Sequence, residues 1–329
     1  MNTNQNDVSC LNTQYATTRM VTTEQPEIKN DSSSKFQTEL FLLAQLGRQG
    51  EGGLRTKGYF KRSFQDNPLV SVITVVFNGH ESIEQTLRSV LEQSYDNVEY
   101  IVIDGGSTDG TTEIIKKYEQ AIDYWVSEPD SGISEAWNKG IKASTGDIIG
   151  IINGGDWYEL NAAKNVAGLF LQNKTAGVIH GIRRQWNESG TLVLGISKPA
   201  TRVEKVTTLR LPVNHPTCFV RRQAYQTYGL FNTSYRVAMD YDFVSRLCKQ
   251  KVCFLYLDAV IANMRTGGAS CGLIGIREGR EIFIRDGGKI GVAYFYYYTE
   301  VLKNFCIRIA DMLKIKMILR NCYWKITGR

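Results

Sequence analysis

Hydrophobic residues in the first half of the chain follow two spacings that alternate along the sequence. Continuous apolar runs, rich in β-branched residues, predict strands buried on both faces; they cover residues 70–77, 99–103, 124–126 and 147–152. Between these runs, apolar residues recur every three or four positions, which predicts helices over residues 81–93, 111–118 and 134–143. Strands that alternate with helices at this rhythm indicate βαβ units and therefore an α/β fold with a mostly parallel central sheet.

The remainder of the chain is less regular. Further strands are expected over residues 178–182, 191–196 and 252–257, and further helices over residues 222–228, 241–249 and 276–284. Residues 1–35 are too polar to bury a face and are expected to be disordered, and residues 38–46 predict one short helix. We therefore predict a polar leader with a short helix (1–66), an α/β domain (67–275) and a helical, basic and aromatic C-terminal extension (276–329).

Composition and charge narrow the class of protein. The chain has 329 residues, 43% hydrophobic and 22% charged, which excludes a disordered chain and a small disulfide scaffold. The net charge is +6, and residues 289–329 carry all of it, with eight Lys and Arg against Glu300 and Asp311. A basic tail after a neutral body indicates an appendage that binds a surface, not a nucleic-acid-binding protein.

The location expected from the sequence is cytoplasmic. Residues 1–35 lack the apolar core of a signal peptide. The longest uncharged apolar stretch, residues 290–299, is shorter than the roughly 18 residues that a spanning helix needs. The seven cysteines contain no CxxC pair and predict reduced thiols, and three histidines are too few to suggest a histidine-built metal site.

Polar residues follow three of the predicted strands, at Phe77-Asn78, at 104–109 and at 153–156. Because ligands bind at the carboxyl ends of parallel strands, we expect these segments to border one crevice. Asp104 ends its strand and is the candidate for a nucleotide contact, whereas Asp109 is expected to cap the helix that begins at Thr111. The chain has no GxGxxG after the first strand and no GxxxxGK[ST], which argues against dinucleotide and P-loop sites.

Three further residues are candidates for chemistry. Asp156 follows a buried strand, and a single carboxylate together with diphosphate oxygens commonly holds Mg²⁺ or Mn²⁺. Asp240 and Asp242 lie at the start of a helix among apolar residues, so one of them is expected to cap the helix and the other to have the raised basicity of a general base. His215 precedes an apolar run, where contact with a diphosphate or an acceptor and simple packing are both open.

Four motifs occur in order: DGGSTDGT from residue 104, EPDSGISEAWNKGI from residue 128, INGGDWY from residue 152 and VAMDYDF from residue 237. Together they resemble the family 2 glycosyltransferases of the GT-A fold, over about residues 68–270, with the closest likeness to bacterial enzymes of capsule, exopolysaccharide and O-antigen assembly. The resemblance implies an inverting, metal-dependent transferase that uses a nucleotide-activated sugar.

The resemblance also implies a role for individual residues. Phe77 matches the aromatic residue that flanks the base, and Asp104 matches the carboxylate that faces it. Three positions match the segment that lines the sugar-diphosphate site: Asp130, Asn138 and Lys139.

The remaining matches concern the metal, the base and the residues that close the site. Asp156 matches the metal-binding carboxylate for Mg²⁺ or Mn²⁺, and Asp240 matches the catalytic base. His215 and Arg265 match residues that close over donor and acceptor. The chain departs from the usual pattern at Gly155, Met239 and Trp137, where acidic, glutamate and arginine residues are common.

The expected reaction is therefore a single displacement in which a hydroxyl of a growing glycan or lipid-linked acceptor attacks a nucleotide-diphosphate sugar, a UDP-sugar by preference. The C-terminal tail is expected either to pack on the core or to lie on the inner face of the cytoplasmic membrane. Two alternatives stay open, a catalytically weak or inactive nucleotide- or glycan-binding module and a nucleotidyltransferase.

Overall fold

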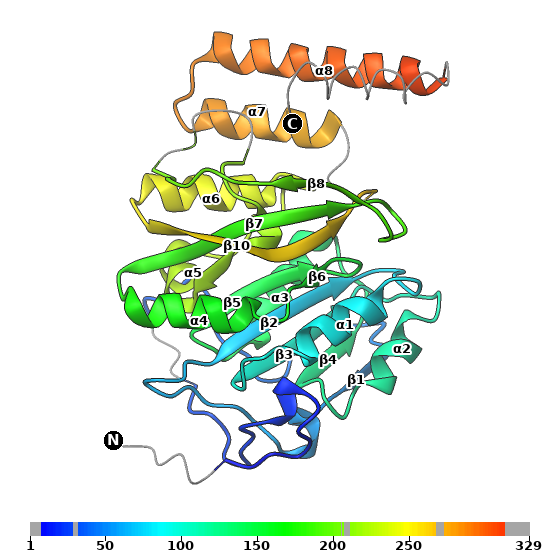
Figure 1. Cartoon of the computed structure of the whole chain (residues 1–329), viewed down its shortest axis with the longest axis vertical. Coiled ribbons are helices and arrows are strands. Elements are labelled where there is room, and N and C mark those ends of the chain that lie inside the picture. The colour runs from blue at the N-terminus through cyan, green and yellow to red at the C-terminus, as the bar shows by residue number, and fades with distance from the viewer. Residues whose placement is uncertain (1–7, 29–31, 205, 207–210, 268–272, 313–329) are drawn as a thin grey trace.

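The computed structural model describes residues 8–28, 32–204, 206, 211–267 and 273–312. Its centre is a ten-stranded sheet with the order β1-β4-β3-β2-β5-β9-β7-β10-β6, and β8 pairs with β7 (Figure 1). The strands are β1 Gly50–Gly52, β2 Val70–Val76, β3 Val98–Asp104, β4 Tyr124–Ser127, β5 Ile148–Asn153, β6 Trp157–Tyr158, β7 Ala176–Trp186, β8 Val193–Ser197, β9 Phe219–Arg221 and β10 Cys253–Arg265. The α-helices are α1 Ile83–Leu91, α2 Thr111–Lys117, α3 Ile133–Ala143, α4 Ala162–Gln172, α5 Arg222–Tyr228, α6 Met239–Lys249, α7 Leu273–Arg285 and α8 Ile290–Met312.

The four strands expected from the first half of the sequence form the parallel centre of the sheet. β4, β3, β2 and β5 lie side by side in that order, and each neighbouring pair is parallel. Every residue of β2 and β3 is buried, as their continuous apolar sequences require. β1, β6, β8 and β9 pair with their neighbours in antiparallel fashion, so the α/β prediction of a largely parallel centre is confirmed and the flanks are mixed.

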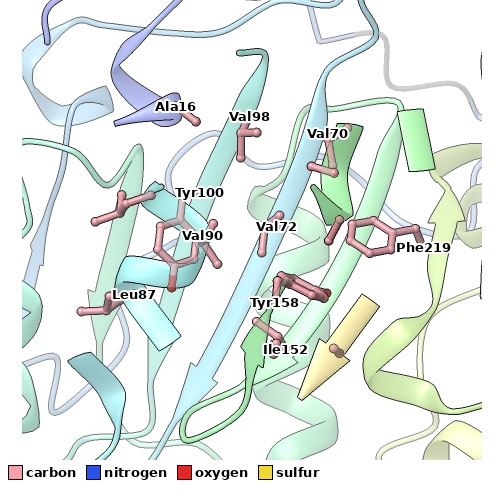
Figure 2. Close-up of a cluster of buried hydrophobic side chains, with 14 of the residues drawn as sticks. Ala16, Val70, Val72, Leu87, Val90, Val98, Tyr100, Ile152, Tyr158 and Phe219 are labelled. Atoms are coloured by element: carbon pink, nitrogen blue, oxygen red, sulfur yellow. The ribbon is translucent and has the colours of Figure 1, made fainter. Parts of the chain in front are cut away.

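Each face of the sheet buries its own hydrophobic core. Val72 belongs to the core under α1 and α4, where it lies near Tyr100 and Tyr158 (Figure 2). The next residue, Ile73, belongs to the opposite core together with Trp137 of α3. This division follows from the period of two along a strand, and it makes a three-layer arrangement with the sheet in the middle.

The expectation of a disordered leader is wrong for its described part. Ala16 and Val21 are fully buried, and Ala16 packs into the core under α1. Residues 38–46 form no helix, because their backbone bonds to the body of the protein instead. The N–H of Leu42 donates to the hydroxyl of Tyr124 (3.0 Å), and the N–H of Glu39 donates to the carbonyl of Lys142 (2.9 Å).

The C-terminal part contains α7 and α8, and the predicted boundary after residue 275 falls inside α7. α7 lies on α6, and α8 lies outside α7 as the outermost layer (Figure 1). Among the described residues, no helix is both long enough and apolar enough to cross a membrane. The 11-residue helix α4 was not expected from the sequence. Its five buried residues recur at helical spacing, and four of them are small enough for close packing: Ala162, Ala163, Val166 and Ala167, with Phe170 as the fifth.

Candidate functional site

The polar segments after β2, β3 and β5 lie together at one edge of the sheet. The parallel register places Val76 beside Asp104 and Val75 beside Asn153. The loops after β2 and β3 are also bonded to each other, since the N–H of Asn78 donates to Ser107 Oγ (2.7 Å) and the N–H of Thr108 donates to Asn78 Oδ1 (3.0 Å). The predicted common edge is therefore observed.

Asp104 lies beneath this loop and is fully buried. Its carboxylate accepts hydrogen bonds from Ser107 N (3.0 Å), Ser107 Oγ, Ser127 Oγ (2.6 Å) and Thr112 Oγ1 (3.4 Å). These donors satisfy the carboxylate within the protein, so Asp104 fixes the shape of the glycine turn, and its contact with a base stays a prediction.

Asp130 is the carboxylate that lies beside Phe77. A Cβ atom built on Gly105 would stand 2.8 Å from Asp130 Oδ2 and 3.4 Å from Phe77 Cδ2, so all three residues converge. The Phe77 side chain is 66% exposed, and burial raises the pKa of Asp130. An exposed ring beside a partly buried acceptor suits a planar heterocycle with N–H donors, and only glycine at position 105 leaves room for that carboxylate.

Asn138 and Lys139 fix α3 in place. The Asn138 amide donates to the carbonyl of Phe231 (2.8 Å) and accepts from its N–H (2.9 Å). The Lys139 ammonium is buried and forms ion pairs with Glu128 (2.9 Å) and Glu135 (3.5 Å). Both side chains are therefore engaged inside the protein, and their contact with a sugar diphosphate stays a prediction.

Asp156 and Arg265 are 109 residues apart in sequence and adjacent in space. Asp156 Oδ1 accepts the backbone N–H of Arg265 (3.0 Å), and the Arg265 guanidinium donates to the carbonyl of Gly155 (3.0 Å). Burial raises the pKa of Asp156 to about 7, against the opposing effect of Arg265 and Arg183. The structure thus brings a carboxylate and a guanidinium, both predicted site residues, to the end of β5.

The donor set at Asp156 fits a metal only if the substrate contributes ligands. In the described part of the chain, no group of three or more His, Cys, Asp or Glu residues is placed to hold an ion. One carboxylate with one oxygen engaged by Arg265 N–H leaves the rest of the coordination sphere to diphosphate oxygens and water. Mg²⁺ is commonly bound in that way, so the residue present is compatible with such an ion.

Trp137, His215 and Asn153 form a second cluster beside Asp156. The Trp137 and His215 rings stack with centroids 4.5 Å apart, and Trp137 Nε1 donates to Asn153 Oδ1 (3.1 Å). Asn153 is also tied to Asp156, whose N–H donates to its carbonyl (3.1 Å). Burial lowers the pKa of His215 to about 4, so the imidazole is neutral at pH 7 and can exchange hydrogen bonds but carries no charge.

The two carboxylates at the start of α6 have different environments. Asp242 forms ion pairs with Arg285 (2.5 Å) and Arg246 (2.9 Å) and is therefore the structural member. Asp240 Oδ1 accepts the N–H of Tyr241 (2.7 Å), and burial raises the pKa of Asp240 to about 6. Asp240 also lies near Cys218, since burial and then the charge of Asp240 raise the pKa of that thiol.

A cavity of about 540 Å³ lies away from these residues, at the ends of β2 and β5 where the two strands begin. Its lining residues include Pro68, Asp147 and Arg222. None of the predicted site residues lines it. We therefore locate the candidate site by its side chains at the carboxyl edge of the sheet, where the perturbed carboxylates Asp130, Asp156 and Asp240 occur.

Part of the chain matches a known protein family. Residues 71–229 match the model of the glycosyl transferase family 2, a segment that holds β2 to α5 and thus the Phe77, Asp130, Asp156 and His215 positions. The chain is therefore similar to the family 2 glycosyltransferases over this segment. The matched segment ends before α6, so Asp240 and Arg265 lie outside it.

Proteins similar to this chain include a hyaluronan synthase and two uncharacterized or putative glycosyltransferases. Hyaluronan synthase of Pasteurella multocida is 27% identical over 237 residues, which cover 70% of this chain and 24% of the synthase. An uncharacterized glycosyltransferase of Mycobacterium tuberculosis is 28% identical over 187 residues, 54% of this chain and 68% of the relative. A putative teichuronic acid biosynthesis glycosyltransferase of Bacillus subtilis, TuaG, is 39% identical over 112 residues, 33% of this chain and 44% of TuaG.

Solved structures share the fold. S. aureus TarS 1–349 in complex with UDP-GlcNAc superimposes with a TM-score of 0.52 at 18% identity, over 68% of this chain and 69% of TarS. The mannosyltransferase PcManGT from Pyrobaculum calidifontis, in complex with GDP-Man and Mn²⁺, gives a TM-score of 0.51 at 18% identity, over 70% of each chain. The fold is therefore that of the GT-A glycosyltransferases, as the sequence motifs predicted.

Proposed function

We propose that this protein is an inverting glycosyltransferase that moves a sugar from a nucleotide-diphosphate donor to a hydroxyl group of a growing surface glycan. The observation that carries the proposal is Asp240, a carboxylate that lies at the start of α6 near Cys218 and has a pKa raised by burial to about 6. Such a group is ionised at neutral pH and is basic enough to accept a proton from a hydroxyl.

The donor nucleotide would bind at the Phe77 end of the site. The exposed Phe77 ring offers a face for stacking, and Asp130 offers an acceptor next to it. The diphosphate would extend toward Arg265, whose guanidinium lies beside Asp156 and supplies positive charge near the leaving group. Donors such as UDP-GlcNAc and GDP-Man, bound by TarS and PcManGT, define the class, and we favour a UDP-sugar.

The transfer step is a single displacement. Asp240 takes the proton of the acceptor hydroxyl while its oxygen forms a bond to the anomeric carbon. The bond from that carbon to the diphosphate oxygen breaks on the opposite face, and the nucleoside diphosphate leaves with the electron pair. The configuration at the anomeric carbon is inverted, and a covalent glycosyl-enzyme is not needed.

A divalent cation is part of the proposal. Asp156 would hold Mg²⁺ or Mn²⁺ together with oxygens of the donor diphosphate, and the ion would neutralise charge on the leaving group. PcManGT, which shares the fold, is in complex with Mn²⁺.

The acceptor and its location follow from the relatives and the C-terminal charge. The related hyaluronan and chondroitin synthases and the putative teichuronic acid biosynthesis glycosyltransferase TuaG favour a growing polysaccharide or a lipid-linked saccharide as acceptor. We propose that α8 and the basic tail contact the inner face of the cytoplasmic membrane, where such an acceptor would be reached. Residues 289–329 carry the whole net charge of +6, and α8 exposes large apolar side chains.

The first experiment is release of nucleoside diphosphate from UDP-, GDP- and dTDP-sugars by the full chain. Each donor is tested with Mn²⁺, with Mg²⁺ and with chelator, with membrane extract as the source of acceptor. We expect turnover of one donor, loss of about 10³-fold or more in Asp240→Asn, and loss in Asp156→Ala or chelator. Asp242→Asn weakens the ion pairs with Arg246 and Arg285 and keeps the base, so it measures how much of a loss comes from damage to α6.

Each outcome separates the candidates. Turnover that Asp240→Asn leaves unchanged would exclude Asp240 as the base. Donor binding without release of diphosphate would favour the binding module. Gly155 and Met239 are consistent with that alternative, because they stand where the family pattern commonly has acidic residues. Release of inorganic pyrophosphate from a nucleoside triphosphate and sugar phosphate would favour a nucleotidyltransferase.

A further inference from the structure

One face of α7 packs on the segment that leads into α6. The residues of α7 on this face are spaced by three, four and three positions, as a helix stripe requires: Gly275, Glu278, Ile282 and Arg285. The segment they cover, residues 235–242, contains Asp240. Most of α7 lies after residue 275, in the predicted C-terminal extension. The contact therefore joins that extension to the candidate site.

Glu278 makes the central contact. Its Oε1 accepts the N–H of Arg236 (2.9 Å), and its Oε2 accepts the N–H groups of Val237 (3.0 Å) and Ala238 (2.9 Å). The amide groups before the first turn of a helix have no partners within that helix, and α6 has no capping side chain at its own N-cap, Ala238. One carboxylate from α7 thus binds three consecutive amides, the last of them two residues before Asp240.

The other residues of the stripe fix the same segment. A Cβ atom built on Gly275 would stand 2.8 Å from Val237 Cγ1, so the Val237 side chain packs against the α7 backbone at a position where a larger residue would not fit. Ile282 is fully buried in a cluster with Ala238 and Tyr241, the residues on either side of Met239-Asp240. Arg285 pairs with Asp242 at 2.5 Å.

We infer that Glu278 is a positioning residue for the transfer reaction: it holds the backbone at 236–238 and thereby fixes where α6 presents Asp240. This inference rests on the proposed function only in taking Asp240 as the base. It gives α7 a role in catalysis, although α7 supplies no group that touches the reacting atoms.

The test compares Glu278→Gln and Glu278→Ala with a matched control, Glu281→Gln. A glutamine has one acceptor oxygen in place of two, so at least one of the three amide bonds is lost. Glu281 lies on the same helix and is 47% exposed in its pair with Arg277, so its substitution changes the charge of α7 without touching residues 236–238. Hydrogen exchange of the full chain, followed over residues 236–242, is measured first. We expect faster exchange there in both Glu278 variants and wild-type exchange in Glu281→Gln.

Kinetics provide the second readout. We expect kcat to fall about 10- to 100-fold in Glu278→Gln with the donor KM within about twofold of wild type, because a displaced base slows chemistry and leaves donor binding intact. In an Asp240→Asn background, Glu278→Gln should have little further effect. Unchanged exchange at residues 236–242, an equal loss in the Asp240→Asn background, or a loss confined to KM would each overturn the inference. If the wild type turns over no donor, the proposed function fails, and the exchange measurement alone decides whether Glu278 orders the segment.

Discussion

At the scale of single residues, the protonation state of Asp240 determines when the proposed base can act. Burial raises the pKa of Asp240 to about 6, so the carboxylate is mostly ionised at pH 7 and mostly protonated at pH 5. A general base works only when ionised. We therefore expect kcat to fall about tenfold per pH unit below pH 6. A rate profile from pH 4.5 to pH 8 measures this, and a plateau extending down to pH 5 would contradict the assignment.

A second residue-scale prediction concerns the ion pair between Arg55 and Glu99. Both side chains are buried, the guanidinium and carboxylate lie 2.7 Å apart, and Arg55 also donates to the carbonyls of Leu40 and Ala143. Burial by itself would raise the pKa of Glu99, but Arg55 and hydrogen bonds from Ser71 and Thr145 lower it overall.

Arg55→Met should therefore destabilise the protein by about 3 kcal/mol or more, because it leaves a buried carboxylate without its cation. In the wild type Glu99 stays ionised down to its ordinary pKa or below, because Arg55 holds its pKa low. In the variant, burial without Arg55 raises the pKa of Glu99, so mild acid protonates the carboxylate and removes the cost of the missing cation. The difference between variant and wild type should thus be largest near neutral pH and smaller in acid. Urea denaturation at pH 7.5 and pH 5 tests both points, and an equal difference at the two values would refute the electrostatic explanation.

The residue scale also shows where sequence reasoning stops. By resemblance, Asp104 faces the base and Asp130 lines the sugar-diphosphate site, but the sequence does not show how either carboxylate is bonded. In the structure, Asp104 accepts hydrogen bonds from hydroxyl and amide donors of the protein, and Asp130 occupies the space that a side chain at position 105 would fill.

At the scale of elements, the glycine of the Asn-Lys-Gly motif sets how closely α3 approaches the sheet. A Cβ atom on Gly140 would stand 2.3 Å from Ile73 Cγ2, in the middle of β2. Gly140→Ala should push α3 from the sheet and destabilise the protein by about 1–3 kcal/mol. Since Trp137 is on the same helix, we also expect a change in tryptophan fluorescence.

Gly168 in α4 is the matched control. It also lies inside a helix, but a Cβ atom there would meet no atom within 4 Å. Gly168→Ala should stabilise the protein by about 0.5–1 kcal/mol through helix propensity. Thermal unfolding measures the change in stability for both variants. A change of the same sign in both would show that close packing does not explain the glycine at position 140.

At the scale of the whole molecule, α8 presents a stripe of apolar side chains away from the body. The stripe has spacings of three, four and three and consists of Phe295, Tyr298, Leu302 and Phe305, each between 59% and 66% exposed. On its other side α8 is held to α7, where the Arg280 guanidinium lies over the rings of Tyr294 and Tyr297. An apolar stripe in the region that carries the net positive charge suits an anionic lipid surface.

We expect the full chain to bind vesicles that contain phosphatidylglycerol and not vesicles of phosphatidylcholine alone, with weaker binding in high salt. Replacing the four stripe residues by serine should weaken binding at least about tenfold. Leu160→Ser and Ile196→Ser, which change exposed apolar residues in other elements, should have no effect. Co-sedimentation measures this, and equal binding by the stripe variant would contradict membrane contact through α8.

The sequence by itself determined the parallel centre of the sheet and the edge where the site lies. Those features depend on neighbours along the chain: β-branched runs make buried strands, and polar residues directly after parallel strands must meet at one edge. The family motifs added Phe77, Asp156 and Asp240 by resemblance.

Only the tertiary structure decided which side chains are satisfied within the protein and which segments support the site. Arg265 reaches Asp156 across 109 residues, and Glu278 reaches Ala238 across 40. The buried N-terminal segment and the stripe of α7 likewise depend on surfaces that exist only after the sheet has formed. Local periodicity carries no information about such pairings, because they are selected by the shape and the unmet hydrogen bonds of the assembled core.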